Sequence, residues 1–194
     1  MSIYKDMAEL LQNGQCGEYR LEHFTITDKD LVAKVRSGIP NGTYISLKHR
    51  GEVVMSNTPM EQRTNLEFVS KAHGKVLIGG LGIGMIIIAI QDKPEVKQIT
   101  VVEKYPEVIE LVKDQLPLNS KVNIVNDDVF EYKPLFKYNA IYMDIWNYIN
   151  KDVYECEMKP LIARYRRYLV KKKEDEQRYI DCWCKYQAKK GIRI

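Results

Sequence analysis

Long hydrophobic runs are missing from this sequence of 194 residues. Its longest apolar stretch, Ile83 to Ile90, is far shorter than the roughly 20 residues that a membrane-spanning helix requires. The amphipathic N-terminal segment also lacks the basic start and apolar centre of a secretory signal peptide. These absences predict a cytoplasmic protein with no membrane partner.

Cysteine and histidine are scarce, at four and three residues. Only Cys182 and Cys184 lie close together, and they lack the second pair or nearby histidine that a zinc site requires. If they lie on a strand, their thiols point to the same side. We expect no metal, reduced thiols packed as small apolar groups, and structural roles for the histidines.

The excess of positive over negative charge is also small, since the net charge is only +4. Basic residues are densest at Arg164 to Lys173, a run followed at once by acidic residues, which indicates a solvated helix end. A second basic stretch, Lys185 to Arg193, is typical of a frayed terminus. We expect no nucleic-acid partner, although this second stretch leaves that alternative open.

The first 57 residues form one region by their pattern of apolar and turn residues. They begin with the amphipathic segment and continue with short strand-like segments separated by turn residues. These segments are Tyr19–Thr27, Leu31–Val35, Tyr44–Lys48 and Val53–Met55. The last two predict a β-hairpin, so residues 1–57 are expected to form a small N-terminal arm.

A helix start follows the arm. Thr58 is a suitable N-cap residue, Pro59 occupies the first helical position, and Glu61 completes a T-x-x-E capping box. The helix is expected to end at His73-Gly74.

From Lys75 onward, strand and helix patterns alternate. The expected strands are Lys75–Gly79, Gln98–Glu103, Val122–Val125, Ala140–Met143 and Tyr179–Trp183; the expected helices are Ile83–Gln91, Pro106–Leu116 and Asp152–Lys171. This alternation predicts an α/β domain over residues 58–194, with a mostly parallel sheet and helices on both faces. Ligands of such sheets bind at the carboxyl ends of the strands.

The first of these strands runs through Gly80-Leu81-Gly82-Ile83-Gly84 directly into a helix. Glycines let the chain turn sharply and let a ligand approach the backbone without a Cβ in the way. Counted from Gly80, Met85 occupies the last position of the dinucleotide fingerprint, where glycine or alanine is required. An NAD site is therefore disfavoured. The remaining G-x-G-x-G spacing is typical of folds that bind S-adenosylmethionine, so Gly80, Gly82 and Gly84 are predicted to bind this cofactor.

Acids follow the next two strands. Glu103 lies roughly 20 residues after the glycine loop, where a carboxylate can accept hydrogen bonds from both ribose hydroxyls. After the third strand, Asp128 is favoured over Asp127 as the acceptor for the exocyclic amine of adenine, with the Val129 amide donating to the ring. A turn-forming role for the two aspartates is the alternative.

These motifs together resemble a known family. The segments that resemble, in order, the motifs of class I S-adenosylmethionine-dependent methyltransferases are Val76–Met85, Ile99–Val112, Ile124–Phe130 and Tyr138–Trp146. In detail they are most similar to the spermidine-synthase-like (polyamine aminopropyltransferase-like) branch, in its short phage and bacterial form. His49–Ala72 resembles the N-terminal arm of that branch. The resemblance implies a truncated, Rossmann-like methyltransferase fold.

The fourth strand ends in Tyr142-Met143-Asp144-Ile145-Trp146-Asn147. In aminopropyltransferases the resembling segment is D-S-S-D, whose first acid positions and deprotonates the attacking amine, which implies a catalytic role for Asp144. Asn147 replaces the second acid, and Gly82 stands where the loop of that branch usually carries aspartate. These departures favour methyl transfer, to an acceptor that the sequence does not identify, over aminopropyl transfer from decarboxylated S-adenosylmethionine.

Three further expectations complete the sequence-based interpretation. Trp146, Tyr148 and Trp183 are candidates for the wall of a substrate pocket, with core or interface packing as the alternative. A non-catalytic binding protein that retains the fold is an alternative function. A homodimer formed through the arm would cover a sheet edge that so short a fold leaves exposed.

Overall fold

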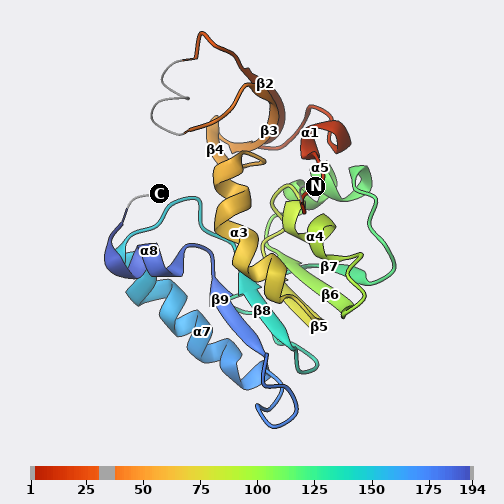
Figure 1. Ribbon diagram of the computed structural model, residues 1–194, viewed down its shortest axis with the longest axis vertical. Helices are drawn as coiled ribbons and strands as arrows, with labels where there is room; N and C mark the ends of the chain where they lie inside the picture. Colours follow the sequence, from red (N-terminus) through yellow and green to blue (C-terminus); the bar gives the residue numbers. More distant parts are fainter. Residues whose placement is uncertain (1–2, 31–37, 193–194) are drawn as a thin grey trace.

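The computed structural model describes residues 3–30 and 38–192, and it contains two β-sheets (Figure 1). One sheet has four antiparallel strands and belongs to the arm, and the other has five strands. The strand expected at Leu31–Val35 lies outside the described residues.

The five-stranded sheet has the order β7-β6-β5-β8-β9, and its strand pairs are parallel. Its strands are β5 (Gly74–Gly79), β6 (Val96–Glu103), β7 (Val122–Asn126), β8 (Ala140–Met143) and β9 (Tyr179–Cys182). The connecting helices include α3 (Pro59–Lys71), α4 (Met85–Ile90), α5 (Pro106–Val112), α7 (Lys159–Tyr165) and α8 (Lys185–Lys190). The predicted α/β fold is thereby confirmed.

Both faces of this sheet are buried, which explains its continuous apolar strands. On β5, Val76 and Ile78 belong to one core cluster, together with residues of α3, α4 and α5. Leu77 points to the opposite face, where a second cluster contains Leu161 and Tyr165 of α7. Alternation along the strand therefore supplies two cores.

The helix expected over Asp152–Lys171 is composite. It consists of α6 (Lys151–Val153), the π-helical turn η2 (Tyr154–Met158), α7, and the 3-10 turn η3 (Arg166–Tyr168). A second 3-10 turn, η1 (Lys113–Gln115), extends α5. None of the helices in the described ranges is long and apolar enough to cross a membrane.

The two neighbouring cysteines do not lie on one strand and do not share a side of the sheet. β9 ends at Cys182, whose side chain belongs to the α7-side core. Cys184 lies beyond the strand at a positive φ of 48° and packs in the opposite core. Both thiols are buried and free, and burial raises the pKa of each. The condition for a shared side is not met, because the chain leaves the strand between the two residues.

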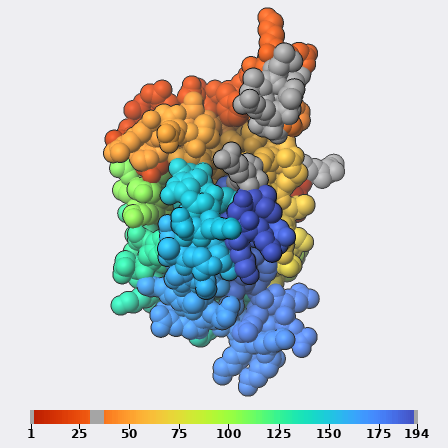
Figure 2. Space-filling view, turned by 90° about the vertical axis from the view of Figure 1, so that its left-hand side faces the viewer, coloured from red at the N-terminus to blue at the C-terminus, as the bar shows by residue number. Residues whose placement is uncertain are grey.

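The arm consists of α1 (Met7–Leu10) and the strands β1 (Gly14–Cys16), β2 (Tyr19–Ile26), β3 (Gly42–His49) and β4 (Glu52–Ser56). The predicted hairpin is confirmed, since β3 and β4 pair antiparallel. Leu21, Ile45 and Leu47 belong to the same buried cluster as Ile78 of the central sheet. Figure 2 shows the arm, in red and orange, capping one end of the molecule. The boundary at residues 57 and 58 stays a prediction.

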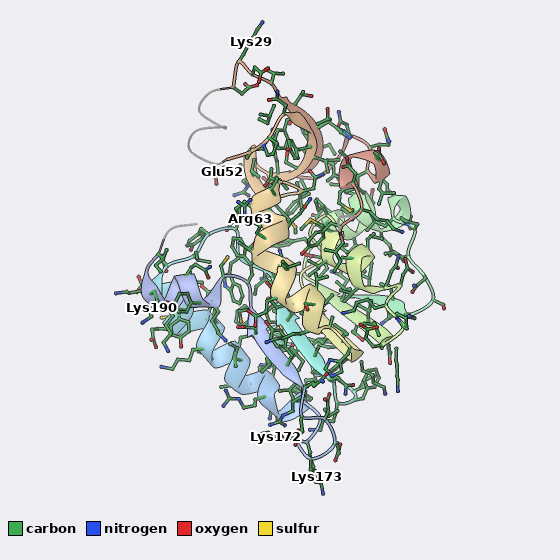
Figure 3. All side chains as sticks on the ribbon, viewed as in Figure 1. Lys29, Glu52, Arg63, Lys172, Lys173 and Lys190 are labelled. Atoms are coloured by element: carbon green, nitrogen blue, oxygen red, sulfur yellow. The ribbon has the colours of Figure 1, made fainter. Side chains whose placement is uncertain are left out.

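Charged side chains extend from both ends of the molecule. Figure 3 shows Lys29 at the tip of the arm and Lys173 at the opposite extremity. Lys172 and Lys173 are exposed, as expected for the solvated end of the basic run.

Next to the start of β5, the His73 Nε2 atom lies 2.7 Å from a carboxylate oxygen of Asp175, which gives this histidine a structural partner.

Helix α3 runs from the arm to the central sheet and is fixed there by aromatic and polar contacts (Figure 1). The rings of Phe68 and Tyr142 stack with their centroids 4.3 Å apart. The Tyr142 hydroxyl donates to Asn65 Oδ1 over 2.9 Å, and Asn65 Nδ2 donates to the carbonyl of Glu61 over 3.0 Å. These contacts fix the position of the first turns of α3.

We expect Phe68→Ala to lower the free energy of unfolding by about 3–5 kcal/mol, because it removes a fully packed ring and leaves a cavity. Urea unfolding followed by circular dichroism measures this loss. The matched control is Leu66→Ala on the exposed face of α3, for which a change within about 0.5 kcal/mol is expected. Equal losses in both variants would contradict the packing role of Phe68.

Candidate functional site

A cavity of about 230 Å³ opens at the carboxyl ends of the central strands. Its walls come from the glycine loop, the ends of β6 and β8, the segment after β7, helix α3 and the arm. Met55 of β4 and Tyr19 of β2 are among the arm residues that line it. The arm therefore helps to build the site that the sequence placed on the central domain.

The glycine loop approaches the end of β8 too closely for side chains. At Gly80, φ is 93°, and a Cβ atom would lie 2.2 Å from the carbonyl oxygen of Asp144. The Gly80 amide donates to the Val102 carbonyl over 2.8 Å, which holds the loop against β6. Gly80 and Gly82 line the cavity, whereas Gly84 lies outside the lining at the start of α4, next to Leu116.

Glu103 is buried at the end of β6, with 6% of its surface exposed. Its Oε2 atom accepts a hydrogen bond from the Leu81 amide over 2.8 Å, and its Oε1 atom accepts one from the Tyr105 amide over 2.9 Å. Burial raises the pKa of the carboxyl group, and the backbone donors partly offset that rise. A carboxylate has about four acceptor positions, so further donors can bind.

Asp128 lines the cavity after β7. It pairs with the Lys104 ammonium at 2.9 Å and accepts a hydrogen bond from the Phe130 amide over 2.8 Å. Burial acts to raise the pKa of Asp128, but Lys104 and the Phe130 amide outweigh it, so the pKa is lowered and the group is a carboxylate at neutral pH. Asp127 is exposed and outside the lining.

Val129, the residue predicted to contact the adenine ring, also lines the cavity. Its carbonyl accepts a hydrogen bond from the Tyr165 hydroxyl over 2.8 Å. Its amide donates no hydrogen bond to the part of the chain that the structure describes. That donor is therefore available to a ligand.

Asp144 follows β8, where its amide donates to the Gly79 carbonyl over 2.8 Å. Its side chain lines the cavity and is partly exposed there, and it accepts no hydrogen bond from residues 3–30 or 38–192. Burial raises the pKa of this carboxyl group to about 7. Asp144 is thus a cavity-facing acid that is partly protonated at neutral pH.

Glu61 was expected to cap helix α3 but instead lines the cavity. The predicted capping box is wrong: Thr58 is the N-cap residue, but its side chain makes no capping hydrogen bond and instead contacts Ser56 Oγ at 3.0 Å. Glu61 is 7% exposed and lines the cavity. Burial and the charge of Asp144 raise its pKa to about 8, while a hydrogen bond from the Ser56 backbone opposes this rise.

Two of the three candidate aromatic residues line the cavity. Trp146 donates from Nε1 to Glu157 Oε2 over 2.8 Å, and Trp183 donates from Nε1 to Thr64 Oγ1 over 3.0 Å. Glu157 also lines the cavity and lies on the π turn η2. Tyr148 is 61% exposed and does not line the cavity.

The cavity is strongly acidic. Five carboxyl groups line it, and among its described lining residues Lys104 is the only one with a cationic side chain. The carboxyl groups belong to Glu61, Glu103, Asp128, Asp144 and Glu157. Within the described residues, no group of three His, Cys, Asp or Glu side chains is placed to hold a metal ion.

Comparisons with known proteins extend no further than the fold. No protein-family model matches the sequence, and no curated protein is significantly similar to it.

Among solved structures, the N-methyltransferase NodS from Bradyrhizobium japonicum WM9, in complex with S-adenosyl-L-homocysteine, aligns with a TM-score of 0.46 and 15% identity, covering 58% of each chain. The plantazolicin methyltransferase BpumL in complex with SAH aligns with a TM-score of 0.40 and 20% identity over 56% of this chain and 39% of its own. A DhpI–SAH complex aligns with a TM-score of 0.42 and 18% identity over 56% and 50%. This chain thus matches less than two thirds of the length of each.

We expect the stability of the protein to fall between about pH 5 and about pH 8 because of Glu61. Its pKa is near 8 in the fold and ordinary when unfolded, so in this window the unfolded chain releases a proton that the folded chain retains. Stability is therefore full below the ordinary pKa and is lost as the pH rises towards the folded pKa. Asp144 acts in the same direction.

Glu61→Gln removes this dependence, so the variant should gain roughly 1–3 kcal/mol relative to the wild type across the window. Urea unfolding at several pH values measures the difference. Glu67→Gln, on the exposed side of the same helix, should follow the wild-type curve. Parallel curves for the wild type and Glu61→Gln would refute the raised pKa.

Proposed function

We propose that the protein binds S-adenosylmethionine in this cavity and transfers its methyl group to an acceptor. The observation that carries the proposal is the position of Glu103, which is buried beside the glycine loop with acceptor capacity left after its two backbone hydrogen bonds. Vicinal hydroxyls of a ribose are the donors that such a carboxylate suits.

The remaining lining residues fit the other parts of an adenosyl ligand. The unpaired amide of Val129 and the carboxylate of Asp128 form a donor–acceptor pair that matches the edge of adenine. Gly80 and Gly82 line the cavity, and a side chain at either position would clash with the Asp144 carbonyl or with Met55, so glycine keeps the loop backbone close to the cavity. Bound S-adenosylmethionine supplies an electrophilic methyl group on a sulfonium.

Asp144 is the group that we assign to catalysis. Its unpaired carboxyl faces the cavity, and its pKa near 7 suits an acid that holds a nucleophile and takes its proton at neutral pH. An ionised Asp144 also favours a nearby cationic centre by electrostatic attraction. The protein aligns the acceptor, and the cofactor provides the reactive group.

Aminopropyl transfer from decarboxylated S-adenosylmethionine is the second candidate, and the acidity of the cavity favours it. A cofactor without its carboxylate avoids repulsion from Glu61, Asp144 and Glu157. The Gly82 amide, which donates no hydrogen bond to the described part of the chain, can instead hold the carboxylate of intact S-adenosylmethionine. A binding protein without turnover is the third candidate, and binding without product would identify it.

We expect Glu103→Gln to weaken S-adenosylhomocysteine binding by roughly 10–100-fold, because hydrogen bonds to a charged acceptor are lost. Isothermal titration calorimetry measures the affinity, and thermal unfolding checks that the variant is folded. The control is the exposed neighbour Asp127→Asn, which should bind as the wild type does. Unchanged affinity in Glu103→Gln, or none in the wild type, would contradict the proposal.

The two transfer reactions are separated by the form of the cofactor that binds. For methyl transfer we expect intact S-adenosylmethionine to bind at least as tightly as its decarboxylated form, since the Gly82 amide receives the carboxylate. Calorimetry with both compounds measures this ratio. A preference of about tenfold or more for the decarboxylated form would instead indicate aminopropyl transfer.

A further inference from the structure

Glu61 belongs to none of the cofactor motifs, yet helix α3 brings it into the same cavity as Asp144. We propose that Glu61 is the second carboxylate of the acceptor site and that the acceptor is a protonated primary amine, whose ammonium group binds between Glu61 and Asp144. This inference rests on the proposed function, because it names the acceptor of the same site.

The charge distribution in the cavity favours a cation near Asp144. Lys104, the one cationic side chain in the described lining, is paired with Asp128 in the adenine part of the proposed site. Neither Glu61 nor Asp144 has an ion-pair partner within the described ranges. Buried carboxyl groups without a partner are costly to ionise, and an ammonium group removes that cost. An anionic acceptor would increase it.

The two carboxyl groups act as a coupled pair. The negative charge of Asp144 is one of the causes that raise the pKa of Glu61, so the groups are close enough to interact. Burial raises both pKa values to near neutrality. The pair in the free protein therefore remains at least partly protonated at neutral pH, and an arriving ammonium group replaces that protonation as the compensating charge.

The carboxyl group of Glu61 comes from an element distant in sequence from Asp144. The loop after β8 supplies no second acid, because Asn147 is exposed and outside the cavity lining. Glu61 arrives instead from the first turn of α3, where the Asn65–Tyr142 hydrogen bond fixes the helix against β8. Helix α3 and the loop after β8, which are far apart in the sequence, thus each contribute one carboxyl group to the proposed acceptor position.

The cavity also offers a surface for the carbon chain of an amine. The indole rings of Trp146 and Trp183 line it and are oriented by hydrogen bonds to Glu157 and Thr64. Indole faces attract cations and pack against methylene groups. The aromatic walls and the carboxyl pair together match an alkylammonium ion.

The transfer step balances with these groups. A carboxylate of the pair takes one N–H proton from the ammonium, which leaves a neutral amine with a free lone pair. That lone pair forms the new C–N bond to the methyl carbon while the C–S bond breaks, and the bonding electrons remain on sulfur as a neutral thioether. The methylated product carries the positive charge, and the proton on the carboxyl group passes to solvent.

The test uses hexylamine as the probe and hexanol and hexanoate as isosteric neutral and anionic controls. Wild type, Glu61→Gln and the surface control Glu67→Gln are each assayed for transfer of labelled methyl groups from S-adenosylmethionine and, separately, for S-adenosylhomocysteine affinity. We expect transfer to hexylamine alone. For Glu61→Gln we expect kcat/KM to fall by about 100-fold, with cofactor affinity unchanged within about threefold.

The pH profile supplies a readout that a merely structural role would not change. In the wild type, transfer to hexylamine should rise with pH as the carboxyl pair ionises, and Glu61→Gln should lose the limb that belongs to Glu61. Glu61→Asp, which keeps a carboxylate, should restore part of the rate. If Glu61→Gln does not fold, the rate of Glu61→Asp and the wild-type preference for amine over alcohol still test the proposed role of Glu61.

Several results would overturn the inference. They are equal turnover of hexanol or hexanoate, undiminished hexylamine turnover in Glu61→Gln, and the absence of both turnover and saturable hexylamine binding in the cofactor-loaded wild type. In each of these cases S-adenosylhomocysteine still binds, so the proposed cofactor site stands. Absence of cofactor binding in the wild type would instead remove both proposals.

Discussion

The hydrogen bond from the Leu81 amide to Glu103 is the contact on which the site depends. It joins the glycine loop after β5 to the end of β6, so two strand ends are brought together by one carboxylate. The buried carboxyl group of Glu103 is stabilised by backbone donors rather than by a cationic side chain, and acceptor capacity remains beside the cavity. The same group therefore organises the loop and, in the function proposed above, would also bind the ribose of the cofactor.

A second constraint is that the arm and the central sheet share a hydrophobic core. Packing of Phe68 against Tyr142 holds α3 in place, and this position carries Glu61 into the cavity. The burial of Glu61 costs stability at neutral pH, chiefly because its carboxyl group loses hydration and also because Asp144 lies near enough to repel its charge. Packing along α3 offsets that cost. If the proposed site is functional, this burial is a case of stability given up for function.

The sequence predicted the parts of this structure that depend on local periodicity. The parallel sheet follows from alternating apolar strands and helices, and the positions of Gly80, Glu103, Asp128 and Asp144 follow from the rule that strand ends bind ligands. Glu61 was not predictable, because T-x-x-E is equally compatible with a local capping box. Its side chain faces the cavity only because α3 packs against β8.

The side on which Cys184 packs was likewise not predictable, since it depends on a left-handed backbone conformation just beyond the end of β9. Glu157 was missed because the sequence pattern gave no sign of an irregularity within its helix.

That irregularity has a consequence for how the site tolerates change in chain length. The π turn η2 places one extra residue in the helical repeat, so the segments on either side of it are out of phase by about 100°. A single-residue deletion within the turn would restore a regular α-helix while moving the side chain of Glu157 about a third of a revolution around the axis. Trp146 would then lose the acceptor that orients its ring. The orientation of the aromatic wall of the cavity therefore depends on the length of this turn.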